Sequence, residues 1–204
     1  LKEGFALYEN RFERKQPQIR KFSKVKLLKN LQDLNNKTLL VWEEQGFGDT
    51  ILFSRFVIKL LNYTDNISFV INKKLKNLFS NFDKKITMLE EEEINEKLFD
   101  YQIPIGSIPK LLNIEQKNQI PFYPIKILSS VNNELNFSFN PNKLNIGIAT
   151  KGNPNYFLDE YRSTSLNNFN DLTDNKNFNI YNLSKGLLKK EFLDHKNLQP
   201  FDGG

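Results

Sequence analysis

From Lys37 onward, short apolar runs alternate with segments whose apolar residues recur at helical spacing. The runs predict buried strands, and the spaced segments predict short helices. Strands are expected at residues 38–42, 67–71, 85–89 and 99–104, and helices at 50–62, 73–79 and 107–112. Strands that alternate with helices are typical of a parallel sheet covered on both faces. The pattern therefore predicts an α/β domain over residues 38–128.

A second pattern of the same kind follows a polar stretch. Residues 129–143 are rich in serine and asparagine and lack periodicity, so we expect an inter-domain connection there. Further strands are expected at residues 144–149 and 179–183, with a polar loop at 151–161 and a short helix at 165–172. Two strands do not complete a doubly wound sheet. We therefore expect residues 144–204 to be the start of a second, truncated α/β domain, and the chain to be a fragment.

The N-terminal segment has a different pattern. Phe5, Tyr8 and Phe12 fall on one face of a helix predicted over residues 1–15. A basic connector follows, and we interpret residues 1–37 as a helical linker. Because the chain begins with leucine, we expect further sequence upstream.

The turn after the first predicted strand contains the main candidate chemistry. Gly46, Gly48 and Asp49 stand between the apolar run and the following helix. Glycines permit a sharp turn and a close approach of a ligand to the backbone, and a helix start offers free N–H groups. The spacing excludes a dinucleotide-binding G-x-G-x-x-G motif, because position 51 is isoleucine, and a P-loop, because Gly-Lys-Ser/Thr is absent. The alternative for Asp49 is an ordinary helix cap.

Composition narrows the class of protein. A hydrophobic content of 39% supports a packed core, and no apolar run approaches the roughly 20 residues that span a bilayer. The absence of cysteine excludes disulfides and cysteine-bound zinc, and no signal peptide is visible, so we expect a cytoplasmic location. The net charge is +5, yet residues 1–37 alone carry +6. A solvated linker explains this excess better than a nucleic-acid site, because no aromatic-interleaved basic motif accompanies it.

Five blocks resemble one family. Residues 42–56, WEEQGFGDTILFSRF, are similar to the start of the glycosyltransferase domain that follows tetratricopeptide repeats in many bacterial proteins, a domain related to the heptosyltransferases. Further matches lie, in order, at residues 4–11, 120–124 and 146–154, the last followed by residues 161–166. The resemblance implies two Rossmann-like domains in the arrangement called GT-B, with repeats upstream that could bind protein.

The resemblance also implies roles for individual residues. Asp49 would be the base that takes the proton of a hydroxyl acceptor, next to the glycine turn of Gly46 and Gly48. The phosphates of a nucleotide-sugar donor would be held by residues after the second domain's first strand, namely Thr150, Lys151, Asn153, Arg162 and Ser163. No metal or other cofactor is expected. The acceptor could be a protein, a lipid or a glycan.

Alternatives remain open at this stage. The chain could be a binding or scaffold module that kept the fold and lost the chemistry, and a basic nucleic-acid-binding domain is a weaker rival. Lys151 and Arg162 could be solvated loop charges. His195, the single histidine, is interpreted as a structural or surface residue, and Glu44 as a solvated residue at a strand end.

Overall fold

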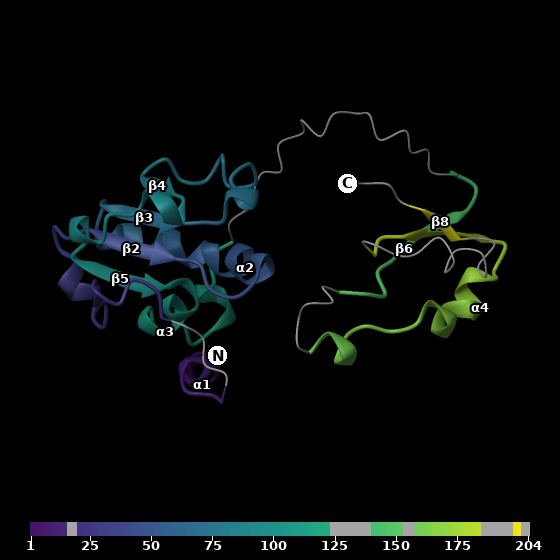
Figure 1. Cartoon of the computed structure of the whole chain (residues 1–204), viewed down its shortest axis with the longest axis horizontal. Coiled ribbons are helices and arrows are strands. Elements are labelled where there is room, and N and C mark those ends of the chain that lie inside the picture. Colours follow the sequence, from purple (N-terminus) through teal and green to yellow (C-terminus); the bar gives the residue numbers. More distant parts are fainter. Residues whose placement is uncertain (16–19, 123–139, 153–157, 185–197, 201–204) are drawn as a thin grey trace. The chain divides into compact units, whose positions relative to one another are not determined.

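The chain folds as two compact units, the first unit comprising residues 1–128 and the second unit residues 129–204. The computed structural model describes residues 1–15, 20–122, 140–152, 158–184 and 198–200. Figure 1 shows a sheet in each unit. The predicted inter-domain connection lies outside the described residues except for residues 140–143.

The first unit contains a five-stranded sheet with the strand order β1-β5-β2-β3-β4. Every neighbouring pair runs parallel, and β2 lies between β3 and β5. The predicted α/β class with a parallel sheet is therefore confirmed. The strands are β1 (Lys26–Leu27), β2 (Leu39–Trp42), β3 (Ile67–Val70), β4 (Ile86–Leu89) and β5 (Tyr101–Pro104).

Strand β2 is buried on both faces of this sheet. Leu39 and Val41 belong to the larger core on one face, and Leu40 and Trp42 to a smaller core on the other. A strand covered on both faces needs an apolar residue at every position. This requirement explains why the strand appears in the sequence as a continuous apolar run. The indole N–H of Trp42 donates to Gln102 on β5 at 2.6 Å, so its one polar atom is satisfied.

Helices and 3-10 turns connect these strands. Helix α2 begins at Phe47, three residues before the predicted start, so Asp49 lies in its first turn. Among the described residues, no helix combines the length and apolar character needed to cross a bilayer. The helical elements are α1 (Lys2–Tyr8), η1 (Glu9–Phe12), η2 (Leu31–Leu34), α2 (Phe47–Val57), η3 (Ile58–Asn62), η4 (Lys73–Leu75), η5 (Glu91–Glu93), η6 (Glu96–Leu98), η7 (Ile105–Ser107), α3 (Ile108–Leu111) and η8 (Lys117–Gln119).

Residues 1–37, for which the sequence predicts a linker, are an integral part of the first unit. Phe5 and Tyr8 of α1 pack against the larger core, and Phe12 is buried in the smaller one. The segment also contributes β1, which pairs with β5 at the edge of the sheet. A strand of two residues is too short to show a period-2 pattern, and for that reason the sequence did not reveal it.

The second unit contains a three-stranded parallel sheet with the order β6-β7-β8. Its strands are β6 (Leu144–Ile148), β7 (Phe178–Asn182) and β8 (Leu198–Pro200), and its helical elements are η9 (Asp159–Tyr161), η10 (Leu166–Phe169) and α4 (Asn170–Thr173). The sequence predicted β6 and β7 but not β8, whose three residues include a proline. The core consists of Ile148, Leu166, Ile180 and Leu198.

Candidate functional site

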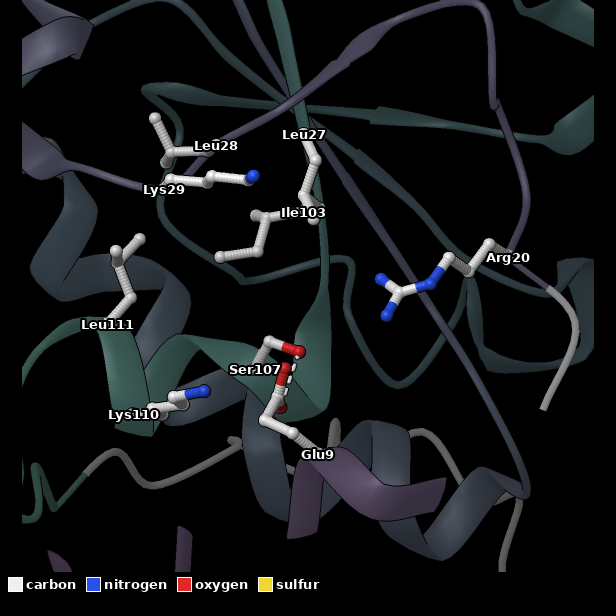
Figure 2. Close-up of a pocket in the computed structure, with 9 residues that line it drawn as sticks. All are labelled: Glu9, Arg20, Leu27, Leu28, Lys29, Ile103, Ser107, Lys110 and Leu111. Carbon is white, nitrogen blue, oxygen red and sulfur yellow. Dashed lines mark hydrogen bonds between the residues drawn. The ribbon is translucent and has the colours of Figure 1, made fainter. Parts of the chain in front are cut away.

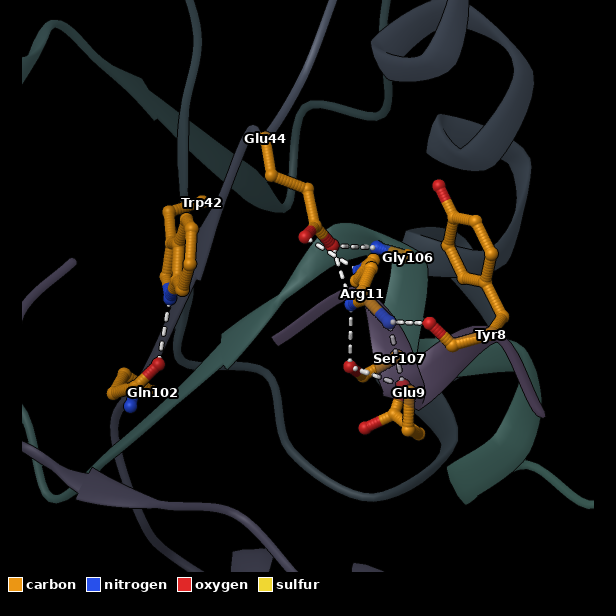
Figure 3. A network of polar contacts seen from close by, with 8 residues as sticks. All are labelled: Tyr8, Glu9, Arg11, Trp42, Glu44, Gln102, Gly106 and Ser107. Carbon is orange, nitrogen blue, oxygen red and sulfur yellow. Dashed lines mark hydrogen bonds and ion pairs between the residues drawn. The ribbon is translucent and has the colours of Figure 1, made fainter. Parts of the chain in front are cut away.

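The strand order of the first unit creates a switch point between β2 and β5. After β2 the chain forms β3 and β4 on one side, and it then returns to form β5 on the other side. In open α/β sheets, ligands bind at the carboxyl ends of the strands at such a point. Here Glu44 follows β2, and Gly106 and Ser107 follow β5. Figure 3 shows that the side chain of Arg11, from the N-terminal segment, lies among these residues.

Arg11 and Glu44 form a buried ion pair at the switch point. The Nε and Nη2 atoms of Arg11 each donate to one carboxylate oxygen of Glu44, at 2.7 Å and 2.7 Å. The backbone N–H of Gly106 donates to the same carboxylate at 2.9 Å. The side chains of Arg11 and Glu44 are 3% and 1% exposed. A pair removed from water in this way needs good geometry and further hydrogen bonds to be tolerated, and both are present.

The remaining donors of Arg11 are also satisfied. Its Nη1 atom donates to the carbonyl oxygen of Tyr8 at 3.0 Å and to Glu9 at 2.8 Å. Its Nη2 atom also donates to the hydroxyl of Ser107 at 2.8 Å, and that hydroxyl donates to Glu9 at 2.8 Å. A guanidinium has five N–H groups, and each has an acceptor here. These contacts define a network of Arg11, Glu44, Glu9 and Ser107, which we call the Arg11 network.

Aromatic rings and a glycine complete the environment of Arg11. The guanidinium carbon lies 4.5 Å from the ring centre of Tyr8 and 4.1 Å from that of Phe12. Burial alone would lower the pKa of Arg11, but hydrogen bonds to the carboxylates of Glu44 and Glu9 outweigh it, and the pKa is raised. A Cβ atom on Gly106 would lie 2.7 Å from a Glu44 oxygen and 2.8 Å from the Tyr8 ring. Position 106 therefore has space for glycine only.

The glycine turn connects Glu44 to α2. Gln45 has a φ of 63°, a left-handed backbone conformation that few residues other than glycine and asparagine adopt. Gly46 and Gly48 are exposed, and Asp49 is half-buried. Gly46 is the N-cap of α2, and Asp49 is the third residue of the helix, where its Oδ2 atom accepts from the N–H of Gly46 at 3.3 Å, as the acidic residue of a capping box does. Asp49 therefore helps to cap its helix without being the N-cap residue, and its role as a base stays a prediction.

A second polar cluster lies at the carboxyl end of β6, within the second unit. Thr150 is buried, and its N–H donates to the hydroxyl of Ser184 at 2.7 Å. The N–H of Lys151 reaches the same hydroxyl at 3.4 Å. The N–H of Gly152 donates to the hydroxyl of Ser163 at 3.1 Å. Four of the five predicted donor-binding residues have described positions in this loop region; Asn153 lies outside the described residues, as does His195.

Arg162 pairs with an acidic residue in this cluster. Its Nε atom donates to Asp159 at 2.8 Å, and the Ser163 hydroxyl donates to the other oxygen of the same carboxylate at 2.9 Å. The hydrogen bond from Arg162 is the main reason that the pKa of Asp159 is lowered. A Cβ atom on Gly152 would lie 2.5 Å from Asp159 and 2.6 Å from Arg162, so glycine lets the loop approach this pair. We call Thr150, Gly152, Asp159, Arg162 and Ser163 the β6-end cluster.

Sequence reasoning missed several participants in these sites, Arg11, Asp159 and Ser184 among them, and it misjudged Glu44. Arg11 lies three residues after Tyr8, so it falls on the apolar face of the predicted N-terminal helix. A charged residue on that face could have indicated a buried ion pair. Glu44 was interpreted as solvated but is buried. Asp159 and Ser184 had no signal, because their partners depend on how the loop folds.

Topology alone identifies no function here, since parallel α/β sheets with polar carboxyl edges occur in proteins with many activities. Comparison with protein-family models, curated proteins and solved structures finds no significant match to this chain. Function therefore has to follow from the side chains at the two carboxyl edges.

Proposed function

We propose that the chain is part of a glycosyltransferase of the GT-B type, which moves a sugar from a nucleotide-activated donor to a hydroxyl acceptor. The observation that carries the proposal is the β6-end cluster, in which a guanidinium, hydroxyl groups and backbone N–H groups gather at the carboxyl end of a parallel strand. Groups of this kind bind phosphate oxygens. The resemblance of residues 42–56 to glycosyltransferases adds the class of donor.

In this proposal the β6-end cluster neutralises the leaving nucleotide phosphate. Arg162 is half-exposed, with 47% of its side chain accessible, so a phosphate can reach it. The phosphate would replace Asp159 as the partner of the guanidinium, and the Ser163 hydroxyl would turn from Asp159 to a phosphate oxygen. Positive charge and oriented donors are most useful where negative charge develops during the reaction. Thr150 and Lys151 would complete the site.

Asp49 is the proposed base for the acceptor hydroxyl. It lies in the first turn of α2, directly after the glycine turn that follows the central strand β2. The Asp49 carboxylate is half-buried, so one side of it remains open to an acceptor hydroxyl. The acceptor would approach over the exposed Gly46 and Gly48.

Calorimetric titration of the intact protein with a panel of nucleotide sugars tests donor binding. Arg162→Ala should weaken binding of the recognised donor by about 1.5–3 kcal/mol, the scale of a charged hydrogen bond. Asp159→Asn should not weaken it, because the competing charge is removed. Lys176→Ala, an exposed cation in the same unit, is the matched control. Unchanged affinity in Arg162→Ala would assign Arg162 to the loop.

Turnover in the intact protein tests Asp49. Asp49→Asn should remove most of the sugar transfer and leave donor affinity unchanged. If transfer persists, Asp49 is a helix cap only.

A second function, a non-catalytic binding or scaffold module, is favoured by one observation. The switch point of the first unit, where a ligand would be expected, is filled by the Arg11 network. Failure of every nucleotide sugar to bind to the intact protein, with its fold verified by circular dichroism, would support this alternative.

A further inference from the structure

A hollow in the first unit lies beside the Arg11 network and takes no part in the proposed transfer. Its volume is about 410 Å³, within the range of small-molecule sites. It is located between β1, β5 and α3, so its walls come from both ends of the first unit's sequence. Leu27, Leu28, Ile103 and Leu111 form its apolar wall, as Figure 2 shows.

Three cations converge on this hollow from separate segments. Arg20 precedes β1, Lys29 follows it, and Lys110 belongs to α3. Figure 2 shows the guanidinium of Arg20 and the amines of Lys29 and Lys110 extending toward the space between them. Within the part of the chain that the structure describes, none of the three forms an ion pair. Like charges repel, so their convergence without carboxylate partners favours an anionic ligand.

The charge balance of the residues in and beside the hollow is positive. The Arg11 network borders the hollow through Glu9 and Ser107. With one cation and the carboxylates of Glu9 and Glu44, it contributes one net negative charge. The three cations therefore leave a balance of two positive charges around the hollow. A phosphate monoester carries close to two negative charges at neutral pH, and arginine can bind its oxygens with two parallel hydrogen bonds.

We propose that this hollow binds a phosphate monoester whose organic part rests on the apolar wall of Leu27, Ile103 and Leu111. This site would give a role to part of the positive charge of residues 1–37, because Arg20 and Lys29 belong to that segment. The same phosphate chemistry can be presented by a soluble metabolite or by a lipid headgroup. A soluble phenyl phosphate and vesicles containing phosphatidic acid distinguish these two sources.

Titration of the chain with phenyl phosphate, followed by calorimetry and by amide chemical shifts, is the test. Binding should weaken about fivefold in Arg20→Gln and in Lys110→Gln, whereas Lys84→Gln, an exposed lysine of the same unit that does not line the hollow, should have no effect. Binding should also weaken below pH 6, where the dianion gains a proton. Inorganic phosphate, which has no apolar part, should bind more weakly than phenyl phosphate.

Vesicle sedimentation completes the test. Binding of phosphatidic acid vesicles without phenyl phosphate binding, lost in Lys110→Gln, would support the site with a lipid as the source. The inference is overturned if neither probe binds, or if Lys84→Gln weakens binding as much as the two hollow variants. Equal affinity for inorganic phosphate and phenyl phosphate would overturn the role of the apolar wall.

Discussion

Removal of the charge on Glu44 should destabilise the first unit strongly. In Glu44→Gln the side chain keeps its size but loses the negative charge that faces Arg11. The new amide group also presents N–H donors to a region where Arg11 and Gly106 already donate at 2.7–2.9 Å. Arg11 cannot escape into water, because its side chain is 3% exposed. The substitution therefore leaves the buried guanidinium with Glu9, whose side chain is 24% exposed, as its remaining carboxylate partner among the described residues.

The expected cost follows from the burial of both partners. Breaking a buried ion pair by removing one charge costs about 3–5 kcal/mol, against a typical domain stability of about 5–15 kcal/mol. Arg11→Met should cost a similar amount, because it leaves the carboxylate of Glu44 buried. Arg11→Met combined with Glu44→Leu should cost less than the sum of the two single changes, since neither charge of the fully buried pair is left alone and Glu9, whose side chain is 24% exposed, can be solvated. We expect a coupling energy of about 2 kcal/mol or more between the two positions.

Urea unfolding followed by tryptophan fluorescence measures these costs in the first unit alone. Trp42 is the only tryptophan in the chain and is fully buried in β2. Glu43→Gln is the matched control, because Glu43 is the adjacent carboxylate. Its side chain accepts one long hydrogen bond, at 3.4 Å, from the hydroxyl of Thr50. It should cost less than about 1 kcal/mol. A cost below that value for Glu44→Gln, or a coupling energy near zero, would refute the buried ion pair.

Further predictions concern the same two sites. Gly106→Ala should destabilise the first unit by about 1–3 kcal/mol in the same urea assay, because a Cβ atom has no space there; wild-type stability would contradict the packing. Burial, and after it the charge of Glu44, raises the pKa of the Tyr8 hydroxyl above its ordinary value of 10.0. The free energy of unfolding should therefore fall as the pH rises from about 10 through the raised pKa of the folded state, and Tyr8→Phe should abolish this decrease. In carboxyl NMR titrations, the pKa of Asp159 should lie below its ordinary value and should rise toward that value in Arg162→Gln. An unchanged pKa in Arg162→Gln would show that the hydrogen bond from Arg162 is not the cause. Hydrogen exchange should be slower in the first unit, which has the larger core, than in the second; equal protection would contradict this.

The sequence by itself determined the local elements around the site. The apolar run Leu39–Trp42, the glycine turn and the helix that follows are all present, because a doubly covered strand and a glycine turn have signatures that span only a few residues. The parallel α/β class followed from the alternation of such elements. The same local reasoning placed Thr150, Arg162 and Ser163 after a strand of the second unit.

Only the tertiary structure decided which distant residues meet. Arg11 and Glu44 are 33 positions apart, and Arg11 and Ser107 are 96 apart, so their contacts depend on the packing of η1 and on β5 lying beside β2. The convergence of Lys110 with two cations of the N-terminal segment has the same origin. Strands as short as β1 and β8 carry too few residues for a period. Periodicity reports burial along one element, whereas the partner of a charge is set by the order of strands in the sheet, which no local pattern encodes.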